Sequence, residues 1–174
     1  NLALGALGLF LLVGGPLSVL ALWYTQGRDL PVGLAAEYVA DPPSDLPPGA
    51  AGTLLDEKAD MQEIIATIVD LARRGVIHME EVKEPGFLGI GERRDHRFHR
   101  LGNEEGLRPY EKYLIERLFG KHQTRDLSDL KERFYTAIPE IKKRLYQELV
   151  DRRLFVRSPE STRSIYMGLG LLVL

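Results

Sequence analysis

The charged residues of this chain are confined to its middle. All 23 lysines and arginines and all 25 aspartates and glutamates lie between Arg28 and Arg163, so that residues 1–27 and 164–174 carry none. An uncharged apolar segment is compatible with the hydrocarbon core of a bilayer, whereas a densely charged one is not. The partition therefore predicts an integral membrane protein with a charged domain between two lipid-facing segments. It does not identify a reaction.

The first apolar segment, residues 1–24, predicts a transmembrane helix. At 1.5 Å per residue it reaches about 36 Å, which exceeds a hydrocarbon core of about 30 Å. It ends in Trp23 and Tyr24, followed by Arg28, residue types that favour the membrane interface. The alternative is a cleaved signal peptide, but the apolar stretch is too long and no basic residue precedes it. Pro16 is expected to kink the helix.

The second apolar segment, residues 164–174, predicts the start of another transmembrane helix. Its ten residues from Ile165 to Leu174 reach only about 15 Å, half of a bilayer core. We expect the chain to be a piece of a longer polypeptide. A short apolar tail is the alternative interpretation.

The charges beside these segments predict that the central domain faces the cytoplasm. Near the second segment arginines outnumber the acidic Asp151 and Glu160, and cytoplasmic flanks carry such an excess. The absence of cysteine agrees with a reducing compartment. We therefore expect an integral protein of the cell (plasma) membrane. The residues predicted at the membrane interface are Trp23, Tyr24, Arg28, Arg157 and Arg163.

Residues 25–52 are interpreted as a proline-rich connector. Five prolines lie between Leu30 and Gly52, and the run from Asp41 to Gly49 is not expected to propagate a helix. Val32–Val39 is the one short strand predicted here. Such a connector would hold the domain away from the membrane.

A helix is predicted from about Asp60 to Arg74. Its apolar residues recur at spacings of three and four, Asp60 and Glu63 form a capping-box pattern, and Gly75 ends it. The apolar residues assigned to its single buried face are Met61, Ile64, Ile65, Ile68, Leu71 and Ala72.

Two strands are predicted next, Val76–Val82 and Arg94–Leu101, joined by the glycine-rich stretch 83–92. A helix followed by two strands has the order of a winged helix, so residues 53–105 are interpreted as a first winged-helix-like module. Residues 106–160 are interpreted as a second, with helices at 109–119, 127–135 and 138–152 and a strand beginning at 154–156. The predicted fold class is α+β: a transmembrane helix, tandem winged-helix-like modules and the start of a second span.

Two stretches of the chain resemble a known family. The run from Pro42 to Asp56 (PPSDLPPGAAGTLLD) and the run from Ile65 to Ile77 (IATIVDLARRGVI) are similar to the cytoplasmic region of the YciQ-like predicted membrane proteins. The similarity continues through 110–119 and 145–150. The resemblance implies an extracytoplasmic β-rich domain before the first span, a cytoplasmic pair of winged-helix-like modules and further spans after them. The family's domain has no assigned function, so it implies no catalytic residues.

The polar residues do not form a pattern typical of catalysis or of cofactor binding. His78, His96 and His99 would approach one another if the two strands pair, but no cysteine or suitably spaced carboxylate completes a zinc site, and surface histidines are the favoured interpretation. A phosphate-binding loop must lead into a helix, but the run from Gly86 to Gly91 lies between two predicted strands. A wing or a lipid-touching hairpin tip is expected instead. We expect no enzyme, no metal and no cofactor; small-molecule binding is left open.

A group of cations near the end of the domain suggests a binding surface. Nucleic-acid binding needs several cations on one face, yet Glu140, Glu148 and Asp151 lie among them and the net charge is −2. Anionic lipid headgroups or a protein partner fit better. We therefore expect a noncatalytic scaffold that docks a protein partner or membrane assembly. The alternatives are a membrane-tethered nucleic-acid regulator and an accessory part of a transporter or enzyme. The surface residues are Lys142, Lys143, Arg144, Arg152 and Arg153.

Overall fold

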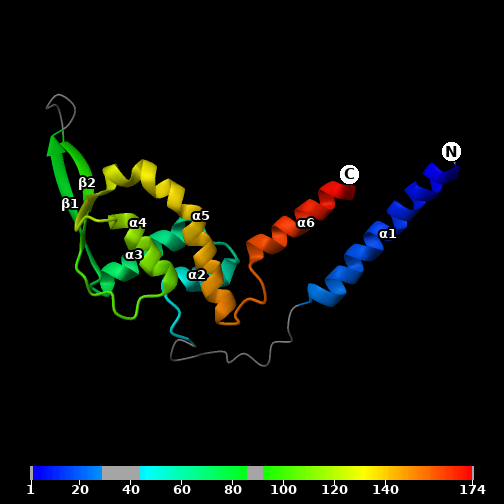
Figure 1. Cartoon of the computed structure of the whole chain (residues 1–174), viewed down its shortest axis with the longest axis horizontal. Coiled ribbons are helices and arrows are strands. Elements are labelled where there is room, and N and C mark those ends of the chain that lie inside the picture. The colour runs from blue at the N-terminus through cyan, green and yellow to red at the C-terminus, as the bar shows by residue number, and fades with distance from the viewer. Residues whose placement is uncertain (1, 29–43, 86–91, 174) are drawn as a thin grey trace. The chain divides into compact units, whose positions relative to one another are not determined.

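The computed structural model describes residues 2–28, 44–85 and 92–173, and within them the fold is mixed α+β (Figure 1). These residues divide into two units. One, called the central unit below, is Leu46–Thr162. The other contains the two ends of the chain. The predicted strand Val32–Val39 lies outside the described residues.

Helix α1, Leu2–Gln26, agrees with the helix predicted for residues 1–24. Its window Gly8–Thr25 has a mean hydropathy of 1.6 and is the one candidate membrane span among the described residues. Trp23 and Tyr24 are exposed at its end, and the Arg28 guanidinium lies 4.9 Å from the centre of the Tyr24 ring. Helix α6, Pro159–Val173, contains residues 164–173 of the second apolar segment and begins five residues before that segment.

Helix α2, Pro48–Asp56, opens the central unit and lies partly within the predicted connector. The expectation that the run through Gly49 cannot propagate a helix is wrong from Pro48 onward. Proline is tolerated at the first helical position because the N–H that it lacks has no intrahelical partner there. Gly49 then lets α2 approach α3 closely, because a Cβ atom at Gly49 would lie 2.6 Å from the Glu63 carbonyl oxygen.

Helix α3, Met61–Arg73, is confirmed with its predicted ends. At its start, the Glu63 carboxylate accepts a hydrogen bond of 2.7 Å from the Asp60 backbone N–H. At its end, Gly75 has a φ of 72°, which favours glycine, and the Val76 N–H donates to the Leu71 carbonyl at 2.9 Å.

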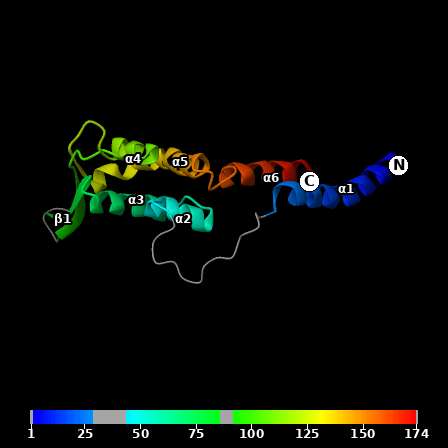
Figure 2. The same cartoon turned by 90° about the horizontal axis from the view of Figure 1, so that it is seen from below.

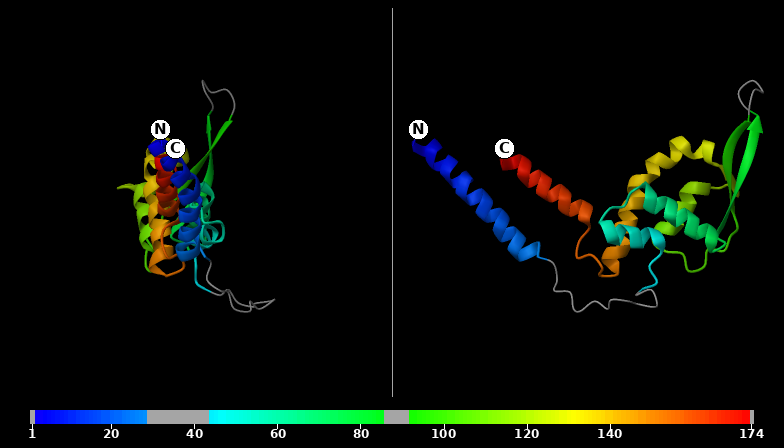
Figure 3. Two further views of the ribbon diagram at one scale, coloured as in Figure 1. Left: turned by 90° about the vertical axis from the view of Figure 1, so that its right-hand side faces the viewer. Right: turned by 180° about the vertical axis from the view of Figure 1, so that it is seen from behind.

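The sheet has three antiparallel strands in the order β1-β2-β3. Strands β1, Ile77–Pro85, and β2, Glu92–Arg100, pair with Ile77 opposite Arg100, close to the predicted bounds. They form a hairpin at one end of the central unit (Figure 3). Strand β3, Thr124–Asp126, adds to β2 and was not predicted. The loop at 86–91, with the wing or lipid contact predicted for it, lies outside the described residues.

Helix α4, Pro109–Phe119, has its predicted bounds, but the chain after β3 differs from prediction. Instead of two helices there is one, α5, Leu127–Asp151, which continues through Pro139 and changes direction between its yellow and orange parts in Figure 1. Proline removes one helical hydrogen bond. Burial of Leu130 before it and Ile141 after it outweighs that loss. The strand predicted at 154–156 is wrong, since no strand forms there.

Helices α2 and α3 lie on one side of the central unit and α4 and α5 on the other (Figure 2). A larger buried cluster joins α3, the sheet, α4 and the first part of α5, and a smaller one lies around Tyr110, Tyr146 and Leu149. Strand β3, from the second predicted module, pairs with β2 from the first. In the part of the chain that the structure describes, the two predicted modules therefore share one sheet, and tandem winged-helix modules are not shown.

Candidate functional site: an apolar groove

Helix α3 has two apolar faces, of which only one is buried. Ile64 and Leu71 point into the core. Met61, Ile65 and Val69 are 37%, 54% and 53% exposed. Because residues four apart lie above one another on a helix, these three form a continuous stripe, called the outer stripe below.

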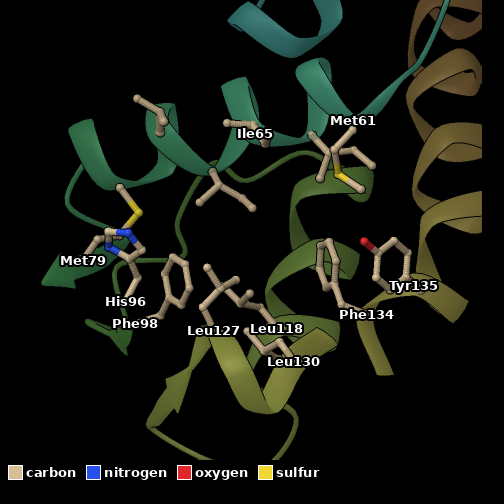
Figure 4. Close-up of a pocket in the computed structure, with 13 residues that line it drawn as sticks. Met61, Ile65, Met79, His96, Phe98, Leu118, Leu127, Leu130, Phe134 and Tyr135 are labelled. Atoms are coloured by element: carbon tan, nitrogen blue, oxygen red, sulfur yellow. The ribbon is translucent and has the colours of Figure 1, made fainter. Parts of the chain in front are cut away.

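The outer stripe borders a groove of about 530 Å³. Helix α3 forms one wall and the first part of α5 forms the other, and their side chains point toward one another (Figure 4). Sheet residues and one residue of α4 complete it. The lining residues are Met61, Ile64, Ile65, Ile68, Val69, Met79, His96, Phe98, Leu118, Leu127, Leu130, Phe134 and Tyr135.

The groove is uncharged and almost without polar groups. Among the thirteen lining residues, only the imidazole of His96 and the hydroxyl of Tyr135 are polar side-chain groups, and none is a carboxylate, ammonium or guanidinium. Burying apolar surface stabilises by about 25 cal/mol per Å², so contiguous exposed apolar surface of this kind marks an interaction site. The arrangement is suited to binding an apolar surface.

Ion pairs between arginines and carboxylates join helices α3, α4 and α5. Glu111 is fully buried on α4, and its carboxylate accepts a hydrogen bond of 2.6 Å from Arg74 at the end of α3. Arg108 pairs with Glu148 of α5, also at 2.6 Å. Burial raises the pKa of the Tyr110 hydroxyl, and the charge of Glu111 adds to that effect. These ion pairs fix α3 to α4 and α4 to α5.

The three predicted histidines do not come together. His78 and His99 are paired across β1 and β2 with ring centres 5.9 Å apart, whereas His96 lines the groove. His99 lies within hydrogen-bond distance of Glu80, at 2.9 Å, and of Thr124, at 3.1 Å. The hydrogen bond with His99 holds the pKa of the Glu80 carboxyl below its usual value. No group of three metal-binding side chains is found among the described residues.

Three cations of the predicted basic surface form ion pairs with acidic side chains. Lys142 pairs with Asp60 at 3.0 Å, and Arg152 pairs with Glu148 at 2.8 Å. Arg144 pairs with Glu140 at 2.9 Å and also lies 4.3 Å from the ring centre of Tyr113.

The remaining predicted contact residues are exposed. Lys143 and Arg153 lie at the surface of the central unit, Arg153 with a φ of 60°. Arg157 and Arg163 are exposed before and within α6. Binding of lipid or partner by any of these cations stays a prediction.

Sequence reasoning missed the groove because it assigned Met61 and Ile65 to the same buried face as Ile64 and Leu71 and did not assign Val69 to any face. A core-facing stripe on a helix is about 100° wide, or three to four residues per two turns. The segment Met61–Arg73 has more apolar residues than one such stripe holds. That excess was the available signal for a second interaction face.

The described residues combine one candidate membrane span with an α+β central unit that carries an exposed apolar groove. Residues 35–174 match the family described as "Predicted membrane protein (DUF2207) C-terminal domain". The match covers most of the chain, which therefore belongs to this family, a domain of unknown function. Searches of curated proteins and of solved structures found no match. The YciQ-like name remains a prediction.

Proposed function

We propose that this chain is a noncatalytic docking module of a membrane assembly, with a cytoplasmic central unit that binds an α-helix of a protein partner in the groove. One observation carries the proposal: the outer stripe of α3 is exposed above a groove that contains no charged side chain. A partner that is itself a transporter or enzyme subunit would make this chain its accessory part, which is one of the alternatives open from the sequence.

The small number of polar groups in the groove favours a helix as the segment that binds there. An extended peptide would bring backbone N–H and C=O groups into apolar surroundings, where each unpaired group costs free energy. A helix pairs these groups internally and presents only side chains. From Met61 to Val69 the outer stripe spans about 12 Å, eight residues at 1.5 Å, which matches about two turns of a partner helix.

The exposure of the walls argues against a small apolar ligand. Sites for small molecules bury about 70–90% of the ligand surface. Here Ile65, Val69 and Tyr135 are each more than half exposed, so the groove is open along one side. An open trough suits a helix, which buries one face and leaves the other in water.

The side chains of helix α3 argue against the nucleic-acid alternative. In a winged-helix-like interpretation of α3, β1 and β2, α3 stands directly before the hairpin, where a recognition helix would lie. Phosphate binding needs several cations on that face. The exposed face of α3 offers Arg73, which pairs with Asp70 at 2.8 Å, beside the apolar outer stripe. Protein docking suits these side chains better.

The ion pairs of three carboxylates support a noncatalytic role. Asp70 and Glu111, which are buried, and Glu148, which is partly buried, each pair with an arginine, so their charges are already neutralised in structural contacts. A general base needs an available carboxylate or imidazole within reach of a substrate.

The test compares partner binding by groove and control variants of the full chain. The double variant Ile65→Asp/Val69→Asp places two charges on the outer stripe, whereas Val156→Asp changes a side chain that is 95% exposed and does not line the groove. We expect wild type and Val156→Asp to purify from mild detergent in the same stoichiometric complex, and the double variant to purify without it.

Circular dichroism and thermal unfolding test whether both variants remain folded. Retention of the complex by the double variant, or equal loss in Val156→Asp, would contradict the proposal.

A further inference from the structure

We infer that the segment after α5, residues 152–157, binds the surface of an anionic bilayer: Leu154 and Val156 insert between lipid headgroups while Arg153 and Arg157 bind their phosphates. This segment is called the surface loop below. The inference concerns a surface outside the groove and does not depend on what the groove binds. It attaches the central unit itself to the bilayer.

The backbone at the end of α5 turns sharply into the surface loop. The Arg153 N–H donates to the Val150 carbonyl at 2.9 Å. The Leu154 N–H donates to the Leu149 carbonyl, also at 2.9 Å, which completes a Schellman cap. Arg153 has a φ of 60°, at the position that glycine usually occupies in this cap. The local fold alone therefore does not explain an arginine here.

One aromatic side chain holds the surface loop against the central unit. Phe155 packs against the smaller buried cluster, which contains Tyr110 and Tyr146. The residues on either side of it are at the surface, with Leu154 41% exposed and Val156 95% exposed. Because Phe155 anchors the loop, its two aliphatic neighbours are presented to the surroundings in a defined place.

Cations flank these two aliphatic side chains. Arg153 and Arg157 are exposed, and neither forms an ion pair with another of the residues that the structure describes. Long arginine side chains reach phosphates at the level of the headgroups while aliphatic neighbours lie deeper, which is the arrangement of an interfacial membrane segment. Negatively charged lipids attract such cations. The surface loop thus offers both contacts that an anionic bilayer surface takes.

The chain itself keeps the surface loop close to the segment predicted to enter the bilayer. Helix α6 begins at Pro159, and its uncharged residues begin at Ser164. Three extended residues and five helical ones reach at most about 18 Å from Val156 to that point. Lipid is therefore within reach of the loop whenever α6 enters the bilayer, whereas a protein partner would have to be brought to it.

A second exposed aliphatic side chain shows how charge selects the contact. Leu55, near the end of α2, is 90% exposed, almost as much as Val156. The ends of α2 and α5 lie at the same end of the central unit, away from the hairpin (Figures 1 and 3). Leu55 is followed by Asp56 and Glu57, which an anionic surface repels. An anionic bilayer therefore accepts Val156 and rejects Leu55, whereas a merely apolar partner would accept both.

The experiment places a spin label at a single introduced cysteine, which is unique because the chain contains none. Full chains carrying Val156→Cys or Leu55→Cys are reconstituted into vesicles of phosphatidylcholine, with or without phosphatidylglycerol. Power-saturation EPR measures collisions of the label with oxygen, which concentrates in hydrocarbon, and with a neutral nickel chelate, which stays in water. With phosphatidylglycerol we expect high oxygen and low nickel contact at position 156 and the reverse at position 55. Without it, oxygen contact at position 156 should fall.

Charge variants in the Val156→Cys chain test the arginines. Each cation near an anionic surface contributes about a fivefold factor, so Arg153→Gln/Arg157→Gln should lower the equilibrium constant for insertion about 30-fold. The label should then give the water signal. Lys121→Gln/Lys143→Gln removes two exposed cations elsewhere on the central unit and should leave oxygen contact unchanged.

Three outcomes would overturn the inference. High nickel contact at position 156 in phosphatidylglycerol vesicles would mean that the loop stays in water. Low contact with both reagents would mean that protein covers it, a second copy included. Equal oxygen contact at positions 55 and 156, or no effect of the arginine changes, would show that charge does not direct the contact. None of these results bears on the groove, whose test is made in detergent, where no bilayer is present and Val156→Asp remains a control.

Discussion

The side chain of Glu111 shows how single residues position the walls of the groove. Besides pairing with Arg74, its carboxylate accepts a hydrogen bond of 2.9 Å from the Arg108 backbone N–H at the start of α4. One buried group thus caps a helix and joins it to α3. A charge without access to water is tolerated only when it is fully paired, so the two interactions depend on each other.

We therefore expect Glu111→Ala to reduce the free energy of unfolding by about 3–5 kcal/mol, the usual cost of breaking a buried ion pair. Glu111→Gln keeps an acceptor for the helix cap and should cost less. The measurement is urea unfolding of the full chain in detergent, followed by circular dichroism. Glu116→Ala, on the exposed side of the same helix, is the control and should change stability by no more than about 0.5 kcal/mol.

Asp126 predicts a dependence of stability on pH. A hydrogen bond from Arg97, 2.7 Å long, and the charge of that arginine hold the pKa of the Asp126 carboxyl below its ordinary value of 3.8. Because the folded-state pKa is depressed, ionised Asp126 stabilises the fold above the unfolded pKa, and this contribution is lost as the pH falls through the folded pKa.

The difference in unfolding midpoint between wild type and Asp126→Asn should be largest near pH 7 and shrink below about pH 4. Urea unfolding between pH 2.5 and 7 measures it. A difference that stayed constant over this range would contradict the assigned role of the Arg97 pair.

Among the helices, α3 allows a direct comparison of a buried and an exposed face, because it carries two adjacent isoleucines, one on each face. Ile64 is buried in the core and Ile65 lies on the outer stripe. Ile64→Ala should cost about 2–5 kcal/mol, as buried isoleucines do, whereas Ile65→Ala should stay within about 1 kcal/mol. Thermal unfolding of the two variants compares identical chemical changes one residue apart. Equal destabilisation would show that the outer stripe belongs to the core.

The contact between α2 and α3 predicts different effects for two glycines. A Cβ atom at Gly49 would collide with the Thr67 hydroxyl and the Glu63 backbone, whereas at Gly52 the closest atom is the Glu63 carboxylate oxygen, at 3.2 Å, which can move. Alanine gains up to about 1 kcal/mol of helix propensity at either site.

Gly49→Ala should therefore destabilise by about 1–3 kcal/mol, because overpacking outweighs the gain, and Gly52→Ala should be nearly neutral. Urea unfolding of the full chain measures both. A stabilised Gly49→Ala variant would mean that α2 moves away from α3 at little cost.

Elements with local signals could be predicted from the sequence, and those set by distant contacts could not. The ends of α3 follow from Asp60, Glu63 and Gly75, which act within a few residues of one another. Strand β3 has three residues, too few for a periodic pattern, and forms because Arg97 and Asp126, far apart in sequence, pair across the strands. The continuity of α5 depends on burial on both sides of Pro139, which local propensity does not contain.

For the whole molecule, the partition of charge predicted the membrane segment, but the groove could not be predicted in the same way. The groove forms between two elements that are distant in sequence, because α3 and the first part of α5 are separated in the chain by the hairpin, α4 and β3. The apolar residues of each wall could equally have met each other in a closed core. The shared three-stranded sheet holds the walls apart, and that sheet depends on the unpredicted β3.

The orientation of the whole protein is open to a direct test. The proposal places the central unit in the cytoplasm because exposed Arg157 and Arg163 lie beside the second apolar segment, and positively charged flanks are retained inside. Since α1 is long enough to cross the bilayer once, positions before and after it should lie on opposite sides. In the cysteine-free chain, a membrane-impermeant maleimide should label Asn1→Cys in intact cells and label Val156→Cys only after permeabilisation. The reverse pattern would place the groove outside the cell, and labelling of both variants in intact cells would mean that α1 does not span the membrane.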